Sequence, residues 1–334
     1  MLDVARLAGV SHQTVSRVLN ASTSVRPETR AKVQAAIDTL GYRRNSAARA
    51  LATNRSGTIG LLTATSHRSG PVSTLVAVEE ASRAAGLYVS VVSLSVYDPV
   101  SVRRALDHFL DQGVEGIITI APVRDAVRAA SAVALDLPMV IVAPPVEPGD
   151  HPVHVAVDQR RGARLAVEHL VGLGHSVIAH LAGPGSWLDA AEREAGWRRA
   201  LAEAGLPVGP LLPGDWSAAS GYAAAQTLLA APGPTAVFAA NDLMAIGLVR
   251  GLTEGGLAVP AEVSVVGFDD IEVAGYALPP LTTVRQDFGA LGRHAVRLLL
   301  AQLAGEQRPL STLVDPALVV RSSTAYRQGS RPRG

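Results

Sequence analysis

The stretch DVARLAGVSHQTVSRVLN, residues 3–20, contains two short apolar-periodic segments separated by a glycine. Gly9 tolerates the positive φ at which a helix often ends, so we expect a tight turn there. Ser11 follows as an N-cap, because its hydroxyl can accept from backbone N–H groups of the next turn. Two short helices joined by such a turn form a helix-turn-helix, whose second helix would enter the major groove of DNA.

The outward face of this second helix carries side chains suited to reading DNA. Gln13 can pair with adenine N6 and N7, Arg17 can reach guanine O6 and N7, and His12 can donate to an acceptor. Phosphate contacts hold the register of a protein on DNA and carry little sequence information. Four polar residues suit that second role: Ser11, Thr14, Ser16 and Asn20.

A third helix is expected to follow and to complete a small helical head. Pro27 predicts its start, because the missing N–H of proline costs nothing at the first helical position. Gly41 is expected to end it. The inner stripe of this helix consists of Val33, Ala36, Ile37 and Leu40. We therefore assign residues 1–44 to a DNA-binding domain of three helices.

The segment NSAARALATNRS, residues 45–56, lacks a wide apolar face. It is either a plain linker or a short hinge helix that forms only on DNA. Asn45 begins it, and Leu51 is its one large apolar side chain. An apolar side chain wedged into a minor-groove base step bends the duplex, which would be the role of Leu51.

The net charge of +1 conceals an asymmetry along the chain. Residues 1–55 hold nine basic and three acidic side chains, a net charge of +6, while the rest hold 21 and 26, a net charge of −5. A basic head on a mildly acidic body is typical of a nucleic-acid reader attached to another domain. A charged helical face in plain solvent is the alternative interpretation.

No sequence feature favours an enzyme, a metalloprotein or a membrane protein. The chain has no cysteine and no run of eighteen apolar residues, and residues 1–13 do not read as a secretory signal. It has no P-loop, nucleophile elbow or GxGxxG after a strand, and its nine histidines show no metal-ligand spacing. We expect no catalysis, no cofactor and a cytoplasmic location.

The body of the chain alternates short β-rich runs such as GIITIA and PMVIVA with helical stretches of ten to fifteen residues. This alternation predicts parallel sheets covered by helices on both faces. The runs are too many for one compact sheet of ordinary size, so two doubly wound lobes are expected. A ligand would bind in the crevice at the carboxyl ends of the strands. The predicted fold is thus α plus α/β.

Polar residues that follow predicted strands define a candidate pocket. Asp269 follows SVVGF, Asn241 follows TAVFAA, and Arg193 is expected to begin the helix after LAGP. A carboxylate, an amide and a guanidinium in one cleft suit a polyhydroxylated ligand. Trp216 and Phe288 would supply apolar faces for a sugar ring. The alternative is that Asn241 or Asp269 merely caps a helix.

A series of motifs in a fixed order now identifies a family resemblance. The motifs are the helix-turn-helix stretch above, then HLVGLGH, LAGP, AGW, GDWSAASG, ANDLMAIG, SVVGFDD and PPLTTVRQDFGALG. Together they resemble the lac repressor family from Leu2 to about Thr324. The resemblance implies that Leu51 is the minor-groove wedge and that the operator is pseudo-palindromic. It also implies that six residues line the inducer site: Arg193, Trp216, Asn241, Asp269, Gln286 and Phe288.

The resemblance further implies two lobes of periplasmic-binding-protein type with chain crossovers near residues 157, 285 and 316. On this basis residues 57–324 form the effector-binding and dimerisation domain. Its N-lobe comprises about 57–156 and 286–315, and its C-lobe about 157–285 and 316–324. Residues 325–334 are expected to be a disordered basic tail.

The N-lobe half of the pocket departs from the family pattern. Ala143 stands where an aspartate is expected and Ile120 where an asparagine is expected, while Arg68 is expected near the mouth. A ligand with a sugar-like part that is not lactose is therefore expected. Arg68 makes an acidic or phosphorylated sugar a candidate, and a solvated surface arginine is the alternative. His12 before Gln13 departs from the usual tyrosine, so the operator sequence is expected to differ.

We therefore predict a homodimeric transcriptional repressor that binds double-stranded operator DNA and a small sugar-like inducer. The alternative effector is a purine or nucleoside acting as a corepressor. A solute-binding protein is disfavoured by the basic head and the missing signal peptide. The residues after Arg321 are polar and basic without leucine heptads, which favours a dimer over a tetramer. Met1 lies almost against the first helix, so either the translation start lies further upstream or the first helix is expected to fray.

Overall fold

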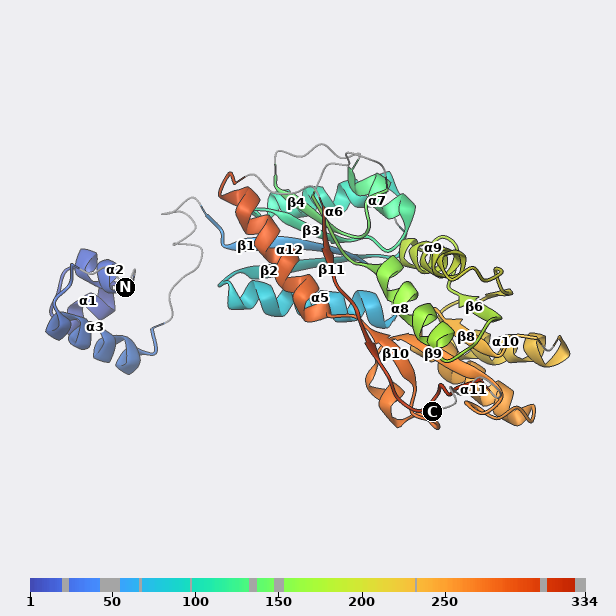
Figure 1. The fold of residues 1–334 in the computed structure, drawn as a ribbon. Helices are drawn as coiled ribbons and strands as arrows, with labels where there is room; N and C mark the ends of the chain where they lie inside the picture. Colours follow the sequence, from blue (N-terminus) through green and yellow to red (C-terminus); the bar gives the residue numbers. More distant parts are fainter. Residues whose placement is uncertain are drawn as a thin grey trace. The chain divides into compact units, whose positions relative to one another are not determined.

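The computed structural model describes residues 1–19, 24–42, 55–65, 68–96, 98–131, 137–146, 153–231, 233–306 and 311–327. They form two compact units, residues 1–56 and 57–334 (Figure 1). No helix within these ranges is both long and apolar enough to cross a membrane.

The first unit contains the helices α1 (Leu2–Ala8), α2 (His12–Leu19) and α3 (Pro27–Leu40). Gly9 has a φ of 65° and ends α1, and the Ser11 hydroxyl accepts from the backbone N–H of Thr14 at 3.2 Å. Val4, Val15 and Val33, one from each helix, are fully buried against one another. The predicted helix-turn-helix with a third helix is confirmed.

The prediction of the inner stripe of α3 is wrong at one residue. Leu40 is 46% exposed, whereas Val33 and Ala36 are buried and Ile37 is partly buried in the core of the head. Leu40 is the last residue of α3, directly before the left-handed Gly41. The apolar periodicity continues to the end of the helix, but the core of the head does not extend as far as Leu40.

The described residues of the second unit form two sheets of six strands. The first sheet has the order β11-β5-β4-β3-β1-β2 and every neighbouring pair in it is parallel. Its strands, in chain order, are β1 (Thr58–Ala64), β2 (Tyr88–Leu94), β3 (Ile117–Ile120), β4 (Met139–Val142), β5 (Val153–Val157) and β11 (Ser311–Val314). We call this sheet and its covering helices the N-lobe.

Helices cover both faces of the first sheet. On one face α5 (Ser69–Ala84) and α12 (Phe288–Leu303) pack on each other and on the sheet, and on the other face lie α6 (Pro99–Asp111) and α7 (Arg124–Ser131). Strands β3 and β4 are therefore buried at every residue. Apolar residues on both faces of a strand are what a covered parallel sheet requires.

The second sheet has the order β12-β10-β9-β8-β6-β7 and is parallel except for β12, which runs antiparallel to β10. Its strands are β6 (Ile178–Ala182), β7 (Leu211–Pro213), β8 (Ala236–Ala239), β9 (Ser264–Asp269), β10 (Thr282–Arg285) and β12 (Ala317–Val319). We call this sheet and its helices the C-lobe. The predicted pair of doubly wound lobes is confirmed.

Four helices cover the second sheet. One core contains α8 (Gln159–Gly172) and α9 (Leu188–Glu203), and the other contains α10 (Ala218–Ala230) and α11 (Asp242–Glu254). A 3-10 helix, η1 (Glu272–Tyr276), follows β9.

The chain passes between the two lobes three times. It leaves the N-lobe sheet after β5, returns to it through α12 after β10, and crosses again between β11 and β12. All three connections are short, which places the segments beside Gln159, Gln286 and Asp315 between the lobes. Figure 1 shows α8, β10 and β11 meeting where the two lobes join.

Residues 325–327, predicted as part of a disordered tail, are instead held against the C-lobe. The N–H of Ala325 donates to the Ser264 hydroxyl, and the N–H of Arg327 donates to the Leu173 carbonyl, both at 3.0 Å. The prediction failed here because polar composition does not reveal which buried acceptors are within reach. Residues 328–334 lie outside the described ranges.

Candidate functional site

The structure brings the predicted pocket residues together between the lobes. One cavity of about 40 Å³ is lined by six of them: Arg68, Arg193, Trp216, Asn241, Asp269 and Gln286. A second cavity of about 50 Å³ is lined by Phe288 and again by Gln286. Trp187 and Asp189 also line both cavities, so the two are parts of one space, which we call the cleft.

Buried polar side chains form the C-lobe side of the cleft. The Arg193 guanidinium is 3.6 Å from the Asp269 carboxylate, and the Gln286 amide donates to the same carboxylate oxygen at 2.7 Å. Arg193 also lies over the Phe268 ring at 3.8 Å and over the Trp216 ring at 5.6 Å. A guanidinium held between two aromatic faces and a carboxylate has a fixed orientation.

Two carboxyl groups of the cleft are perturbed by burial. Burial raises the pKa of Asp269 to about 6, although Arg193 and Gln286 act to lower it. Burial likewise raises the pKa of Asp189, against the effect of Arg193. Strongly perturbed carboxyls in a crevice mark functional sites more often than structural ones.

The backbone is strained at two of the predicted residues. Trp216 has a φ of 72° and Asp269 a φ of 110°, which L side chains rarely adopt. The Trp216 indole packs on Gly183, where any Cβ would lie within 2.3 Å of the ring. Strained non-glycine residues persist only where the surrounding structure holds them in place, and they cluster at ligand sites.

Asn241 serves two purposes. Its Oδ1 accepts from the backbone N–H of Met244 at 2.9 Å and caps α11, as the alternative interpretation suggested. Its Nδ2 also donates to the Trp216 carbonyl at 3.1 Å. Asn241 therefore lines the cleft and fixes the strained backbone of Trp216, while Asp269 ends β9 and is not the N-cap of a helix that the structure describes.

The N-lobe side of the cleft is mostly apolar. It presents Pro71, Ile120, Ala121, Pro122, Val142, Ala143, Phe288 and Leu291. Ile120 and Ala143 are buried where the family pattern expects polar groups. Arg68 is half-buried at the residue before α5 and lines the smaller cavity.

The cleft residues that the sequence analysis missed include Gln159, Trp187 and Asp189. Trp187 and Asp189 follow β6 through the loop that begins α9, so strand-end position was an available signal. Gln159 follows β5 in the same way. None of the three falls within a motif that carries the family resemblance, and so they were overlooked.

The start of α9 also connects the lobes. The backbone N–H of Leu188 donates to the Pro122 carbonyl at 3.0 Å, and Trp187 forms an isolated antiparallel bridge with Val123. The Leu188 side chain, only 6% exposed, is buried in a core cluster otherwise made by the N-lobe. We call residues 187–188 with their N-lobe partners the inter-lobe clasp.

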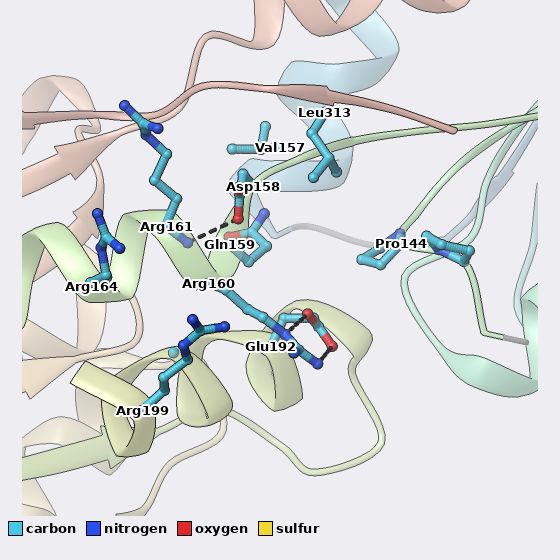
Figure 2. Close-up of a pocket in the computed structure, with 12 residues that line it drawn as sticks. Pro144, Val157, Asp158, Gln159, Arg160, Arg161, Arg164, Glu192, Arg199 and Leu313 are labelled. Atoms are coloured by element: carbon cyan, nitrogen blue, oxygen red, sulfur yellow. Dashed lines mark hydrogen bonds and ion pairs between the residues drawn. The ribbon is translucent and has the colours of Figure 1, made fainter. Parts of the chain in front are cut away.

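A larger groove of about 520 Å³ lies on the other side of Gln159, which lines both spaces. Figure 2 shows the arginines of α8 and α9 on one side of the groove and Pro144 on the other. Each of these arginines has an acidic partner: Arg160 pairs with Glu192, Arg161 with Asp315, Arg164 with Glu168 and Arg199 with Glu203. None of the predicted effector residues lines this groove.

The head presents the predicted DNA-reading residues on one helix. His12, Gln13 and Arg17 are exposed on α2, and Gln13 and Arg17 are four residues apart, on the same face. Ser11 is exposed and bonds to the Thr14 hydroxyl at 3.0 Å, and Thr14 and Ser16 are half-buried. Asn20, Asn45 and Leu51 lie outside the described residues.

A helix-turn-helix head followed by two doubly wound lobes around a polar cleft defines a DNA-binding regulator that responds to a ligand. The model for bacterial regulatory proteins of the lacI family matches residues 1–45, and that for periplasmic binding protein-like domains matches residues 167–324. The chain is 38% identical to the lactose operon repressor of Escherichia coli strain K12, over 97% of this chain and 90% of that one. The chain therefore belongs to the lacI family.

The chain is also similar to other repressors and to solved structures of the family. The HTH-type transcriptional repressor PurR of Photobacterium profundum is 33% identical over 96% of this chain and 97% of its own. The lac repressor dimer bound to operator and the anti-inducer ONPF superposes with a TM-score of 0.84 at 37% identity, covering 97% and 98% of the two chains. The CelR–cellobiose complex superposes with a TM-score of 0.72 at 33% identity, covering 96% and 98%.

Proposed function

We propose that this protein is a homodimeric transcriptional repressor of the cytoplasm whose operator affinity is controlled by a small sugar-like effector. The observation that carries the proposal is the convergence of Arg193, Asn241 and Asp269 in one cleft of a chain that begins with a helix-turn-helix head. Two heads on one dimer would match a pseudo-palindromic operator. The dimeric lac repressor complex with operator supports this arrangement.

The chemistry of the cleft favours a polyhydroxylated ligand. Arg193 is a donor, Asp269 an acceptor, and the Asn241 amide can act as both. The buried indole N–H of Trp216 has no acceptor among the described residues, and a ligand oxygen would satisfy it. Trp187 and Trp216 offer aromatic faces of the kind that sugar rings contact. The cellobiose complex of CelR supports a carbohydrate.

The two sides of the cleft differ in polarity, which narrows the range of ligands that fit. Hydroxyl groups would be recognised from the C-lobe, while the apolar N-lobe wall would contact a less polar part of the ligand. A neutral disaccharide or a glycoside with an apolar aglycone meets both demands. Arg68 adds a cation at the edge, so acidic sugars belong in the same test.

Effector binding would change the separation of the lobes. The cavities of about 40 and 50 Å³ are far smaller than the roughly 300 Å³ of an ordinary small-molecule pocket. A sugar therefore requires side-chain or lobe movement. Such movement alters DNA affinity only to the extent that the ligand binds the two states with different affinity.

Thermal unfolding with a ligand panel tests the proposal. The panel comprises neutral disaccharides, alkyl and aryl glycosides, sugar acids, sugar phosphates, nucleosides and purines. A ligand at a hundred times its dissociation constant stabilises the folded state by about 2.7 kcal/mol and raises Tm. We expect one sugar class to raise Tm in the wild type but not in Arg193→Ala.

The matched control is Arg199→Ala, which removes an exposed arginine of the same helix outside the cleft. The control should retain the ligand-induced rise in Tm. A shift with purines alone would overturn the sugar effector and favour the purine-corepressor alternative. A shift that survives in Arg193→Ala would place the ligand outside the cleft.

A further inference from the structure

Gln159 belongs to a closed ring of buried side chains in the wall of the cleft. Its Nε2 donates to Gln286 Oε1 at 2.9 Å, and its Oε1 accepts from Arg193 Nε at 2.8 Å. Gln286 in turn donates to Asp269 at 2.7 Å, and Arg193 lies 3.6 Å from Asp269. Gln159, Gln286 and Arg193 are 4%, 7% and 3% exposed. Buried networks of this kind stabilise one arrangement only when each member is satisfied.

The ring has a fixed direction. Asp269, when ionised, can only accept and Arg193 can only donate, so the amide between them has no freedom to reverse. Gln286 must turn its NH₂ toward Asp269, which leaves its oxygen facing Gln159. Gln159 must turn its oxygen toward Arg193, which leaves its NH₂ facing Gln286. Both constraints on Gln159 agree.

The ring also connects two of the chain crossovers. Gln159 is the first residue of α8, two positions after β5 ends, and Gln286 directly follows β10. The hydrogen bond between them therefore joins neighbouring connections between the lobes. Figure 2 shows Gln159 between Asp158 and Arg160 at this place, on the boundary of the larger groove.

We propose that Gln159 is a positioning residue of the effector site. It holds the Arg193 guanidinium and the Gln286 amide in the orientation that the ligand meets, and it fastens the first two crossovers to that site. A ligand that displaces Arg193 or Asp269 changes the bonds of Gln159 and thereby the connection between the lobes. This inference rests on the proposed function for its ligand, but the geometry of the ring does not depend on it.

Two substitutions separate the two contacts of Gln159. Gln159→Met fills a similar volume and removes both hydrogen bonds. Gln159→Glu retains an acceptor for Arg193 but has no donor for the side-chain oxygen of Gln286. Gln286 must then lose its hydrogen bond either to residue 159 or to Asp269. The matched control is Gln302→Met on α12, where the side-chain amide donates only to the Met139 carbonyl at 3.2 Å.

Proton NMR of [¹⁵N]arginine-labelled protein tests the hydrogen bonds of the ring without any ligand. Arg193 is the one arginine that is buried among the described residues, so its Nε–H should exchange slowly with water. The Arg193→Lys variant assigns the resonance. We expect protection in the wild type, in Gln302→Met and in Gln159→Glu, and at least a 10-fold faster exchange in Gln159→Met, because one hydrogen bond to a charged group is lost.

A sugar that raises Tm in the panel provides the second readout. Its dissociation constant should rise about 10-fold or more in Gln159→Met, while Gln302→Met leaves it unchanged. Equal protection of the Arg193 resonance in Gln159→Met and the wild type would overturn the positioning role. So would an altered resonance with an unaltered dissociation constant. If no sugar in the panel binds, the proposed function fails and the ligand-free resonance still decides whether Gln159 positions Arg193.

Discussion

The indole of Trp187 meets the indole of Trp216 edge to face, with ring centroids 5.6 Å apart and an angle of 71° between the planes. The two side chains come from different loops of the C-lobe, and both line the cleft. Edge-to-face contact is a favourable geometry for aromatic pairs. A ligand in the cleft would therefore lie next to this pair.

Effector binding should therefore change the intrinsic tryptophan fluorescence. The chain has three tryptophans, and the third, Trp197, is fully buried in the core of the C-lobe. Titration of the wild type with a ligand from the panel should give a saturable change in emission. Trp187→Phe should lose about half of that change or more and retain a folded protein, because Trp187 is only half-buried. An unchanged amplitude in Trp187→Phe would place the ligand away from the pair.

Truncation of the inter-lobe clasp should destabilise the protein. Leu188→Ala removes a buried leucine from the N-lobe core, and such changes cost about 2–4 kcal/mol of the free energy of unfolding. Hydrogen exchange should also accelerate at the backbone N–H of Leu188, which donates to Pro122 across the lobes. Urea unfolding and exchange mass spectrometry measure the two effects.

The control for this prediction is Leu211→Ala, because Leu211 lies in β7 of the same lobe and is 43% exposed. It should cost less than about 1 kcal/mol, as surface substitutions usually do. Equal losses in the two variants would mean that the contact of Leu188 with the N-lobe adds no stability.

The fold could be predicted from the sequence because its signals are local. Strands such as IITI and MVIV are apolar on both faces, and only a covered parallel sheet buries both. Gly9 and Ser11 fix the helix-turn-helix through a positive φ and a cap, which need no distant partner. The prediction that Leu40 is buried was wrong, because the size of the core, and not the helical period, decides burial at the end of α3.

The candidate site could be predicted only in part. Asn241 and Asp269 sit at strand ends and inside recognisable motifs, so their convergence follows from the sheet topology. Arg193 lies inside α9 rather than at its start, and the family resemblance assigned it to the cleft. The bonds of Gln159 to Arg193 and Gln286 join residues 34 and 127 positions apart. No periodicity encodes such contacts, and a glutamine at the start of a helix is unremarkable in sequence. The strained φ of Trp216 is likewise visible only in the folded chain.

Substitution of Arg17 should weaken DNA binding in a sequence-dependent way. The operator is first obtained by selection from random duplexes, which should yield a pseudo-palindrome. A bidentate contact from arginine to guanine is worth about 1–3 kcal/mol of discrimination, so Arg17→Ala should lose about 10-fold or more in affinity and relax preference at one position of each half-site. Fluorescence anisotropy on labelled duplexes measures both effects.

Lys32→Ala provides a control with the same change of charge in the head, because Lys32 is exposed on α3 rather than on α2. It should leave base preference unchanged, and any loss of affinity should be uniform across sequences, as expected for a phosphate contact. Relaxed preference in Lys32→Ala instead of Arg17→Ala would mean that α2 is not the reading helix.

The two neighbouring aspartates at the end of β9 should respond to pH in opposite directions. Burial raises the pKa of Asp269 to about 6, so its ionised form is disfavoured in the folded state. The folded protein then binds more protons than the unfolded chain between about pH 4 and pH 6, and Asp269 lowers stability as pH rises through this range. Asp269→Asn should therefore be more stable than the wild type at pH 7.5 by about 1–3 kcal/mol, and should lose that advantage near pH 4.

Asp270 is the matched control. Although burial acts to raise it, hydrogen bonds from Arg285 and Arg321 lower the pKa of Asp270 overall. Its carboxylate thus stabilises the folded state at neutral pH, and this contribution is lost as pH falls through the depressed folded pKa. Asp270→Asn should be less stable than the wild type at pH 7.5. If both variants lose stability at pH 7.5, Asp269 contributes to the fold as a charged group, and the energetic cost assigned to its burial in the cleft is wrong.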